Sequence, residues 1–537
     1  MRTKWVYLNE INRLPEDIKT KYGKVFGQIF HNRGYKIIRP ELKYFPKAEN
    51  YPKIEQVASR IIEWINNGEK IGIFGDYDVD GITSVVIFTE LLDRLGVKYS
   101  VKFPTRETGY GVKKKDIDHF IREGIKKVIL FDNGTSFNEV LRYARENGVE
   151  VIVVDHHEEK EKTEVELLLN PKADNVELFR DLCTAGLSFY LTGVINSKMG
   201  KPLVMKKLLP ITAVGTVADV VPLSDINRII VRNGMTKFDE TEQIGLKQLK
   251  ELSGIKEVNE YSIGFIIAPR LNAAGRLSDP YIAYQLLKTD SELEAYKIAN
   301  ELERLNRKRQ YETDKALESL LLQINPKDKV NILTGKFKKG IVGILAGKIA
   351  RLTSKPTIVG TEVNGIVYAS GRSVEGVNIV DLLSQVRDLL ITYGGHDMAC
   401  GLAFEIKNIE KLRERLNLLL SDFEYEQVIE IDLPLDINYW TPQRASFLEK
   451  VGPYGNGNER PVFSSFAEVV NVKEYNKLYI LGVKEKGRYY KVKAWKSEVP
   501  SIQKGKVEIA YSIIGKRNGE EPEIFLKGIR DGDRGDQ

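Results

Sequence analysis

Three short strings of acidic and imidazole side chains have the residue types that metal-dependent hydrolysis needs. Their members are Asp76, Asp78, Asp80, Asp132, Asp155, His156 and His157. Carboxylates crowded together repel one another unless a cation neutralises them, and their oxygens suit Mg²⁺ or Mn²⁺. One such string alone would fit an acidic, solvated turn just as well. Because the pattern recurs three times, we favour a metal site.

Each of these strings begins where an apolar run ends. The runs cover residues 71–74, 127–131 and 149–154, which is the length of a short buried strand. In a βαβ sheet the carboxyl ends of parallel strands share one edge, so the acids can meet in space. We therefore expect a parallel sheet with a metal site beyond that edge.

A further acid, Asp219, stands between Ala218 and Val220 and interrupts another apolar segment. A carboxylate buried there needs a partner. A metal ion would supply one, and so would an ion pair or a helix cap, which for this residue taken alone is the commoner arrangement.

The composition is that of a globular protein with several domains. The chain has 537 residues, of which 42% are hydrophobic and 29% charged. The net charge is only +6, so any nucleic-acid surface must be local. Two cysteines without metal-ligand spacing fit a reducing compartment. With no signal-peptide pattern and no membrane-length apolar run, we expect a cytoplasmic protein.

Two segments in the middle of the chain indicate how the domains are connected. Residues 290–325 lack Gly and Pro and are highly charged, which predicts a long helix bridging two domains. A coiled coil fits less well, because the apolar pattern lasts too few heptads. The basic loop at 335–340 precedes a helix rich in small residues. It could cradle phosphate at the helix N-terminus or be an ordinary basic turn.

The last part of the chain interleaves aromatic and basic residues along short alternating segments. The candidate nucleic-acid-binding rings are Tyr479, Tyr489, Tyr490 and Trp495. Alternation predicts rings and cations on the two faces of strands, which suits an OB barrel that binds single strands. A barrel with aromatic residues in its core and lysines outside, without binding, fits equally well.

The chain resembles the DHH phosphoesterase superfamily in Asp78-x-Asp80, Asp132, Asp155-His156-His157 and Asp219. Four fuller strings make it similar, within that superfamily, to the RecJ-like single-strand-specific 5′→3′ exonucleases. The strings that carry the resemblance are Gly75-Asp-Tyr-Asp-Val-Asp-Gly81, Asn272-Ala-Ala-Gly-Arg276, Ser370-Gly-Arg-Ser373 and Gly394-Gly-His396. The resemblance runs from about residue 48 to about residue 530. Many relatives have His where this chain has Phe74, and Cys where it has Asn133.

The resemblance implies an α/β architecture in which a parallel-sheet DHH domain is joined by a long helix to a smaller α/β DHH-associated domain, followed by a β-barrel OB fold. The expected parts are an N-terminal extension packed on the first domain (1–47), the DHH catalytic domain (48–289), the connecting helix (290–325), the DHH-associated domain (326–424), the OB-fold domain (425–530) and a frayed tail (531–537).

The resemblance also implies roles for individual residues. Asp78 and Asp132 would hold one metal, with water in the position where relatives have His. The second metal would be held by Asp80, Asp132, His156 and Asp219. The remaining assignments are Asp76 and Asp155 for orienting the loop and imidazole, His157 and Arg276 for the scissile phosphate, His396 for the leaving side, and Arg106, Ser370 and Arg372 for the 5′-terminal phosphate. We expect two divalent cations, with Mn²⁺ favoured by the His ligand and Mg²⁺ as the alternative.

The implied activity is metal-dependent 5′→3′ hydrolysis of single-stranded DNA to nucleoside 5′-monophosphates, in DNA repair and recombination. RNA stays open as a substrate, and a single-strand-binding protein or a helicase is the expected kind of partner. One alternative is a DHH enzyme for short oligoribonucleotides or small nucleotides, although such enzymes usually lack the barrel. Another is a non-catalytic replication-complex subunit of RecJ descent, although such proteins have lost acids that this chain keeps.

Overall fold

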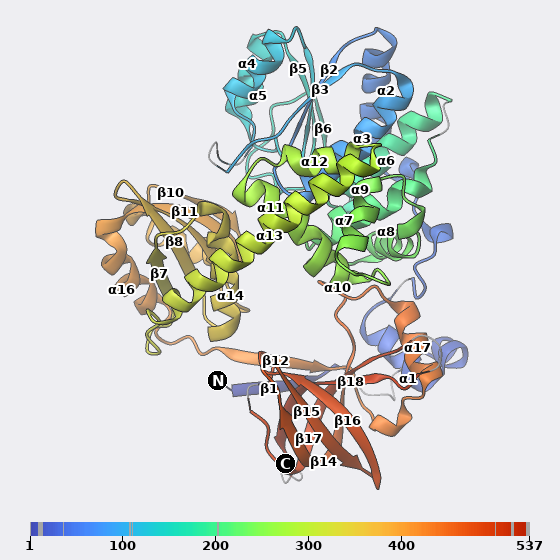
Figure 1. Cartoon of the computed structure of the whole chain (residues 1–537), viewed down its shortest axis with the longest axis vertical. Coiled ribbons are helices and arrows are strands. Elements are labelled where there is room, and N and C mark those ends of the chain that lie inside the picture. Colours follow the sequence, from blue (N-terminus) through green and yellow to red (C-terminus); the bar gives the residue numbers. More distant parts are fainter. Residues whose placement is uncertain are drawn as a thin grey trace. The chain divides into compact units, whose positions relative to one another are not determined.

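The computed structural model describes residues 2–8, 14–35, 37–106, 109, 111–200, 203–499, 501–516 and 520–532. It divides into two compact units, one formed by Met1–Pro40 with Phe423–Gln537 and the other by Glu41–Asp422 (Figure 1). Within the described residues, no helix combines the length and the apolar character that crossing a membrane requires. The domain boundaries that we expect near residues 289, 325 and 424 stay predictions.

The larger unit begins with a five-stranded, all-parallel sheet in the order β3-β2-β4-β5-β6. Its strands are β2 (Ile71–Gly75), β3 (Tyr99–Lys102), β4 (Lys127–Phe131), β5 (Glu150–Val154) and β6 (Leu167–Leu169). Figure 1 shows helices on both sides, with α2 (Pro52–Asn66), α3 (Val79–Leu95) and α6 (Thr184–Lys198) on one and α4 (Lys114–Arg122) and α5 (Asn138–Glu146) on the other.

Side-chain alternation along the strands builds a separate core on each face of this sheet. Ile71 and Ile73 of β2 join the core under α2, α3 and α6, whereas Phe74 joins the core under α4 and α5. All five β2 residues are buried, as expected for a strand covered on both sides. Because helices cover both faces of the sheet, a ligand site can lie only at its edge.

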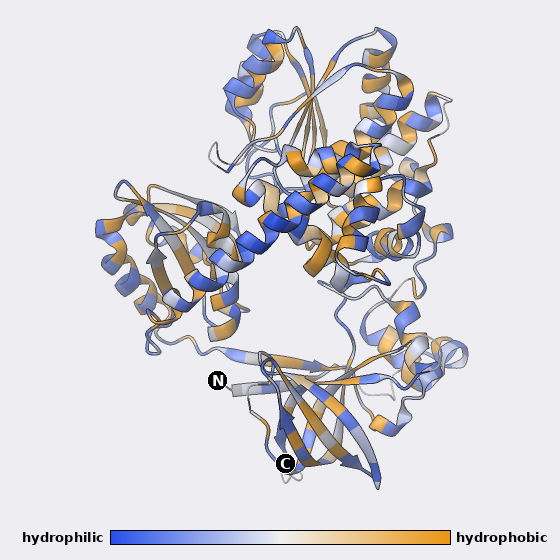
Figure 2. Ribbon diagram, viewed as in Figure 1, coloured by the Kyte–Doolittle hydropathy of each residue, from blue (hydrophilic) through white to orange (hydrophobic). Residues whose placement is uncertain are grey.

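Helices follow this sheet and lead to the second half of the unit. They are α7 (Leu209–Ala218), α8 (Asp225–Thr236), α9 (Ile244–Leu252), α10 (Glu260–Ser262), the π-helix η7 (Ile263–Ile267), α11 (Ala268–Leu277), α12 (Tyr281–Lys288) and α13 (Glu292–Leu321). The long charged helix that we predicted is α13, and Figure 2 shows its middle as hydrophilic.

A second, mixed sheet completes the larger unit in the order β10-β11-β9-β8-β7. It contains β7 (Asn331–Gly335), β8 (Thr357–Val363), β9 (Ile366–Arg372), β10 (Thr392–His396) and β11 (Ala399–Glu405), with α14 (Lys339–Thr353), α15 (Ile379–Ser384) and α16 (Ile409–Leu419). Only the β7–β8 pair is parallel.

The smaller unit is a closed β-barrel with added N-terminal elements. Its sheet runs β13-β14-β15-β16-β18-β17, and pairing of β14 with β17 closes it. The strands are β13 (Leu433–Pro434), β14 (Val462–Glu474), β15 (Leu478–Glu485), β16 (Arg488–Trp495), β17 (Gly505–Ile514) and β18 (Glu523–Asp531), and α17 (Pro442–Val451) precedes β14. The predicted architecture of two α/β parts and an OB barrel is confirmed. Residues 533–537, most of the tail predicted to be frayed, lie outside the described residues.

The N-terminal extension does not pack as expected. β1 (Arg2–Tyr7) pairs in parallel with β12 (Glu426–Ile431). Residues 1–40 belong to the smaller unit, so the prediction that they pack on the first domain is wrong. Helix α1 (Glu16–Asn32) places Ile29 and Phe30 in the barrel's hydrophobic core. The local sequence could not reveal this pairing, because the strand with which β1 forms its hydrogen bonds lies more than 400 residues away in the sequence.

A buried ion pair should make this N-terminal docking important for the barrel. Arg33 donates from Nε and Nη2 to the two carboxylate oxygens of Asp432, at 2.7 and 2.8 Å, and the Asp432 side chain has no exposed surface. Arg33→Ala leaves that charge buried and unpaired. We expect a loss of ~3–5 kcal/mol in the free energy of unfolding of the smaller unit.

Hydrogen exchange of the full chain, followed separately over residues 41–422 and 423–532, measures this effect. Lys19→Ala is the control, because it removes an exposed pair with Glu16 and should change stability by less than about 1 kcal/mol. Loss of protection over 41–422, or equal loss in both variants, would contradict the prediction.

Candidate active site

The acids at the three strand ends share one edge of the parallel sheet. Gly75 at the end of β2 is in register with Phe131 of β4, which is in register with Val154 of β5. Each of these residues is followed by an acid, so Asp76, Asp132 and Asp155 emerge side by side. The sheet topology therefore produces the convergence that the sequence predicts.

Helix α3 begins inside the first acidic string, and Asp78 is its N-cap. The Asp78 Oδ1 atom accepts hydrogen bonds from the backbone N–H groups of Asp80 and Gly81, at 3.0 and 3.2 Å. A Cβ on Gly81 would lie 2.5 Å from the backbone nitrogen of Asp76. Only glycine permits this close approach, which folds the string back so that its acids cluster.

The start of α6 holds two of the acids in place. Asp80 accepts hydrogen bonds from the backbone N–H groups of Thr184 and Ala185, at 2.8 and 2.9 Å. The Thr184 hydroxyl donates to Asp132 Oδ1 at 3.1 Å. Asp132 itself has φ +63°, a left-handed conformation that costs free energy in a residue with a side chain. Nothing in the local sequence around Thr184 indicated this role.

His156 and Asp219 complete the cluster. The His156 Nε2 atom lies 3.4 Å from Asp132 Oδ1, 3.5 Å from Asp219 Oδ2 and 3.8 Å from Asp80 Oδ2. Asp219 caps the end of α7, and Val220 after it has φ +62°, which is unusual for a β-branched residue. The apolar segment thus ends in a strained turn that directs Asp219 into the cluster.

Three sets of side chains have ligand atoms within 4.8 Å of one another. They are Asp80 with His156 and Asp219, Asp132 with His156 and His157, and Asp76 with Asp78 and Asp132. The first set consists of residues that we predicted as metal ligands, and the second joins two predicted ligands to His157, which we predicted to contact the scissile phosphate. The third places Asp76, predicted only to orient the loop, beside two predicted ligands.

The electrostatics of these carboxylates call for a cation. Burial, followed by the charge of a neighbouring aspartate, raises the pKa of Asp76, Asp132 and Asp219 well above the ordinary value and that of Asp80 to about 6. Within the described part of the chain, neither ring nitrogen of buried His156 has a hydrogen-bond partner. Carboxylate oxygens with one imidazole nitrogen form a donor set that suits Mn²⁺ or Mg²⁺. The residues present therefore fit a divalent metal.

Phe74 lies outside this cluster. Its side chain is fully buried in the core under α4 and α5, with Phe120 and Leu130 among its neighbours. The position is therefore part of the hydrophobic core, and the extra carboxylate of the third set comes from Asp76 instead.

His157 lies at the margin of the cluster, 4.0 Å from Asp132 Oδ1, and makes its short contact with Asp155. Its Nδ1 atom lies 2.7 Å from Asp155 Oδ1, which also accepts the backbone N–H of His156 at 2.8 Å. Burial opposes the charge of the His157 ring, but the charge and hydrogen bond of Asp155 outweigh it and raise the pKa of His157 to about 9. The His396 ring lies 6.3 Å from that of His157, nearly parallel at 17°. The second sheet therefore places His396 beside His157, which follows a strand of the first sheet, as the order of the motifs suggested.

A separate open pocket of about 420 Å³ collects the residues predicted to bind a 5′-phosphate. Arg106, Ser370 and Arg372 all line it, together with Arg276. The Arg372 guanidinium donates to Ser370 Oγ at 3.0 Å, and that of Arg106 lies 4.2 Å above the ring of Tyr77. Residues from both halves of the larger unit therefore meet here.

Close backbone packing holds these two halves together. Arg276 Nη1 donates to the backbone oxygen of Gly340 at 3.1 Å, and a Cβ on Gly340 would lie 2.1 Å from the backbone oxygen of Arg276. The start of α14 therefore rests directly on the end of α11. Lys339 and Tyr368 also line the pocket, and neither was among the predicted site residues. The basic loop at 335–340 was the available signal for Lys339.

On the barrel, the structure separates the four predicted rings into two pairs. Tyr489 and Trp495 are 69% and 43% exposed, whereas Tyr479 and Tyr490 pack against the core. Tyr489, Lys491, Lys493 and Trp495 share the outer face of β16, because they alternate with Tyr490, Val492 and Ala494. The expectation that rings and cations occupy opposite faces holds for Tyr479 and Tyr490 but is wrong for Tyr489 and Trp495, which share the outer face with the lysines.

Family models match three parts of the chain. They are the DHH family N-terminal domain over residues 70–216, the DHHA1 domain over 328–422 and the RecJ OB domain over 431–520. The single-stranded-DNA-specific exonuclease RecJ of Bacillus subtilis is 33% identical over 76% of this chain, and the match covers 53% of that protein. The chain thus spans about half the length of this relative.

Two further relatives are matched over more of their length. RecJ of Escherichia coli is 30% identical over 76% of this chain and 77% of its own length. The crystal structure of RecJ from Thermus thermophilus in complex with Mn²⁺ superimposes with a TM-score of 0.87 and 28% identity, covering 99% of this chain and 80% of that one. The three matched domain models, together with these relatives, show that the chain belongs to the RecJ family.

Proposed function

We propose that the chain is a metal-dependent exonuclease that degrades single-stranded DNA from the 5′ end. One juxtaposition carries this proposal. Strand β10 supplies Gly395 to the cationic pocket and, in the next position, His396 to the ring of His157 beside the carboxylate cluster. The pocket proposed to bind the end of a strand therefore lies next to the cluster proposed to hold metal ions.

The carboxylate cluster would hold two divalent cations. Asp76, Asp78 and Asp132 suit one, while Asp80, Asp132, His156 and Asp219 suit the other, with Asp132 shared. Bound there, the ions would supply a nucleophilic water and stabilise the charge of the attacked phosphate. We favour Mn²⁺ over Mg²⁺ because of the imidazole ligand, and the T. thermophilus relative has been crystallised with each.

The protein's own groups would bind and orient the scissile phosphate. His157, kept cationic by Asp155, can donate a hydrogen bond to a phosphate oxygen. Arg276 adds a guanidinium from the lining of the pocket, and the His396 ring lies beside that of His157. Asp155 acts through His157, whose ring it orients.

The pocket would determine that cleavage starts at the 5′ end of the strand. A terminal phosphate carries about −1.5 to −2 charge at pH 7, more than an internal diester. Arg106 and Arg372 offer planar donor forks to such a group, and Ser370 offers a hydroxyl. A 5′ end fixed there presents the first internal phosphodiester to the cluster, so the products would be nucleoside 5′-monophosphates.

The outer face of β16 would hold the strand further from its end. Tyr489 and Trp495 provide exposed rings for stacking, and Lys491 and Lys493 lie between them on the same face. A helicase or single-strand-binding protein as partner stays an expectation from the family resemblance.

Changing the shared ligand tests the metal centre. Asp132→Asn keeps the shape of the side chain but removes its charge from two of the three ligand sets. We expect strand cleavage with Mn²⁺ to fall more than about a hundredfold, the effect of losing one transition-state-stabilising group. Single-strand affinity, measured by fluorescence anisotropy, should stay the same.

The control is Asp118→Asn, since Asp118 bonds to the Tyr143 hydroxyl on the far side of the sheet. It should keep both cleavage and bound metal, the latter measured by mass spectrometry. If Asp132→Asn retained a tenth of the activity, the assignment of the cluster would be wrong.

The pocket predicts a preference for phosphorylated ends. Wild-type protein should cut a 5′-phosphorylated strand faster than the same strand with a 5′-hydroxyl. Arg372→Ala should remove most of that preference, roughly ten- to hundredfold, because charge-assisted hydrogen bonds are lost. Arg351→Ala, on the exposed side of α14, is the matched control. Equal rates on both ends in wild type would place end recognition elsewhere.

The barrel predicts a dependence on strand length. Trp495→Ala should weaken binding to long single strands about five- to hundredfold, the range for one lost stacking contact. Hydrolysis of di- and trinucleotides should not change, because the cluster and the pocket proposed to bind them belong to the larger unit. Tyr296→Ala, another exposed ring, serves as control. A wild-type preference for dinucleotides over long strands would instead favour a small-nucleotide phosphodiesterase.

A further inference from the structure

The end-binding pocket carries more positive charge than one phosphate requires. Its cations are Arg106, Arg276, Lys339 and Arg372, and its lining contains no aspartate or glutamate. Among the described residues, none of the four forms an ion pair with a carboxylate. Four cations without a counter-charge repel one another, so the pocket should favour a ligand with several negative charges.

The burial of these groups strengthens that requirement. Burial, followed by the charge of neighbouring Arg106, lowers the pKa of Arg276 to about 9. Burial also lowers the pKa of Arg372. Such cations have lost much of their hydration and are stabilised again only when an anion enters.

Lys339 lies where a second phosphate could reach it. It is exposed at the start of α14, and its Nζ atom lies 3.4 Å from the centre of the Tyr368 ring. The long, flexible lysine side chain ends in a point charge, whereas the half-buried arginines around it present planar forks of donors. The pocket volume of about 420 Å³ falls in the range of sites for whole small molecules, so it has room for more than one phosphate.

We propose that this pocket also accepts strands with a 5′-triphosphate and that Lys339 binds a phosphate beyond the first. This inference rests on the proposed function, because the same pocket must place the strand for cleavage. A triphosphate adds about one negative charge for each further phosphate. The four cations would then face a comparable negative charge.

The chemistry of cleavage defines the products. A water oxygen bonds to the phosphorus of the first internal phosphodiester and gives up its proton, and the bond from that phosphorus to the first nucleotide's O3′ breaks. The O3′ atom takes a proton. The first nucleotide therefore leaves with its whole triphosphate, and the shortened strand keeps a 5′-monophosphate.

The experiment compares three single strands of one sequence that carry a 5′-hydroxyl, a 5′-monophosphate or a 5′-triphosphate. We expect the triphosphorylated strand to be cut within about fivefold of the monophosphorylated rate and at least about tenfold faster than the hydroxyl strand. Mass spectrometry should identify the first product as a nucleoside 5′-triphosphate and all later ones as monophosphates.

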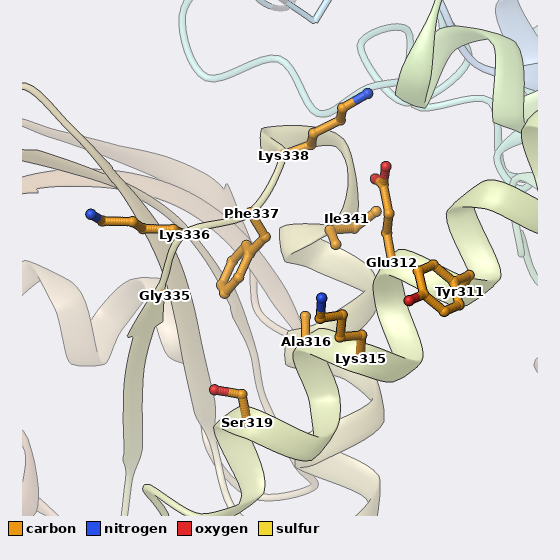
Figure 3. Close-up of a pocket in the computed structure, with 10 residues that line it drawn as sticks. All are labelled: Tyr311, Glu312, Lys315, Ala316, Ser319, Gly335, Lys336, Phe337, Lys338 and Ile341. Carbon is orange, nitrogen blue, oxygen red and sulfur yellow. The ribbon is translucent and has the colours of Figure 1, made fainter.

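Lys339→Gln tests the residue assigned to the extra phosphate. It should lower kcat/KM on the triphosphorylated strand about tenfold while changing the monophosphorylated strand less than about threefold. Lys336→Gln is the matched control from the same loop. Lys336 lines a different pocket of about 470 Å³, and Figure 3 shows its side chain pointing away from the neighbouring Lys338. This control should leave both rates unchanged.

The outcomes separate this inference from the proposed function. If the monophosphorylated strand is not preferred over the hydroxyl strand, the end pocket itself is misassigned. If it is preferred but the triphosphorylated strand is cut as slowly as the hydroxyl strand, only the present inference is overturned. The inference also fails if Lys339→Gln slows both phosphorylated strands equally, or if pyrophosphate is released before the first nucleotide.

Discussion

Repulsion among buried carboxylates at one edge of a parallel sheet is the constraint on which the rest of this structure depends. Asp76, Asp80, Asp132 and Asp219 all have raised pKa values because burial and their neighbours disfavour the charged form. Backbone N–H groups at the start of α6 offset part of that cost at Asp80. The remainder calls for cations, so folding and metal binding should be thermodynamically linked.

The same requirement explains the backbone strain and close packing around the cluster. Asp132 and Val220 have positive φ, which would be costly without a tertiary structure that determines both positions. A Cβ on Gly215 would lie 2.4 Å from Thr83 Oγ1, so α7 and α3 can approach only because this residue is glycine. Strain and tight contact thus occur where side chains must be held against their mutual repulsion.

A second consequence concerns which side chains each half of the larger unit contributes. The half built on the first sheet supplies the acids, from strand ends and from α3 and α7, whereas the half built on the second sheet supplies Ser370, Arg372 and His396. The backbone of Gly340 packs closely against that of Arg276, and the Arg276 guanidinium donates to the Gly340 oxygen. This contact joins the half that carries the carboxylate cluster to the half that supplies most of the cationic pocket.

Local patterns in the sequence were enough to identify the acids, their place after apolar strands and the order of the motifs, because strand ends and helix starts depend on two to four neighbouring residues. They also indicated α13 and the barrel. Tertiary packing alone placed Asp76 beside Asp78 and Asp132, Phe74 in the core, and Lys339 in the lining of the pocket with three arginines. It also decided that β1 joins β12 and that Tyr489 and Trp495 share a face with lysines. These features depend on which distant segments pack together and which strand face meets the core, and no local pattern specifies either.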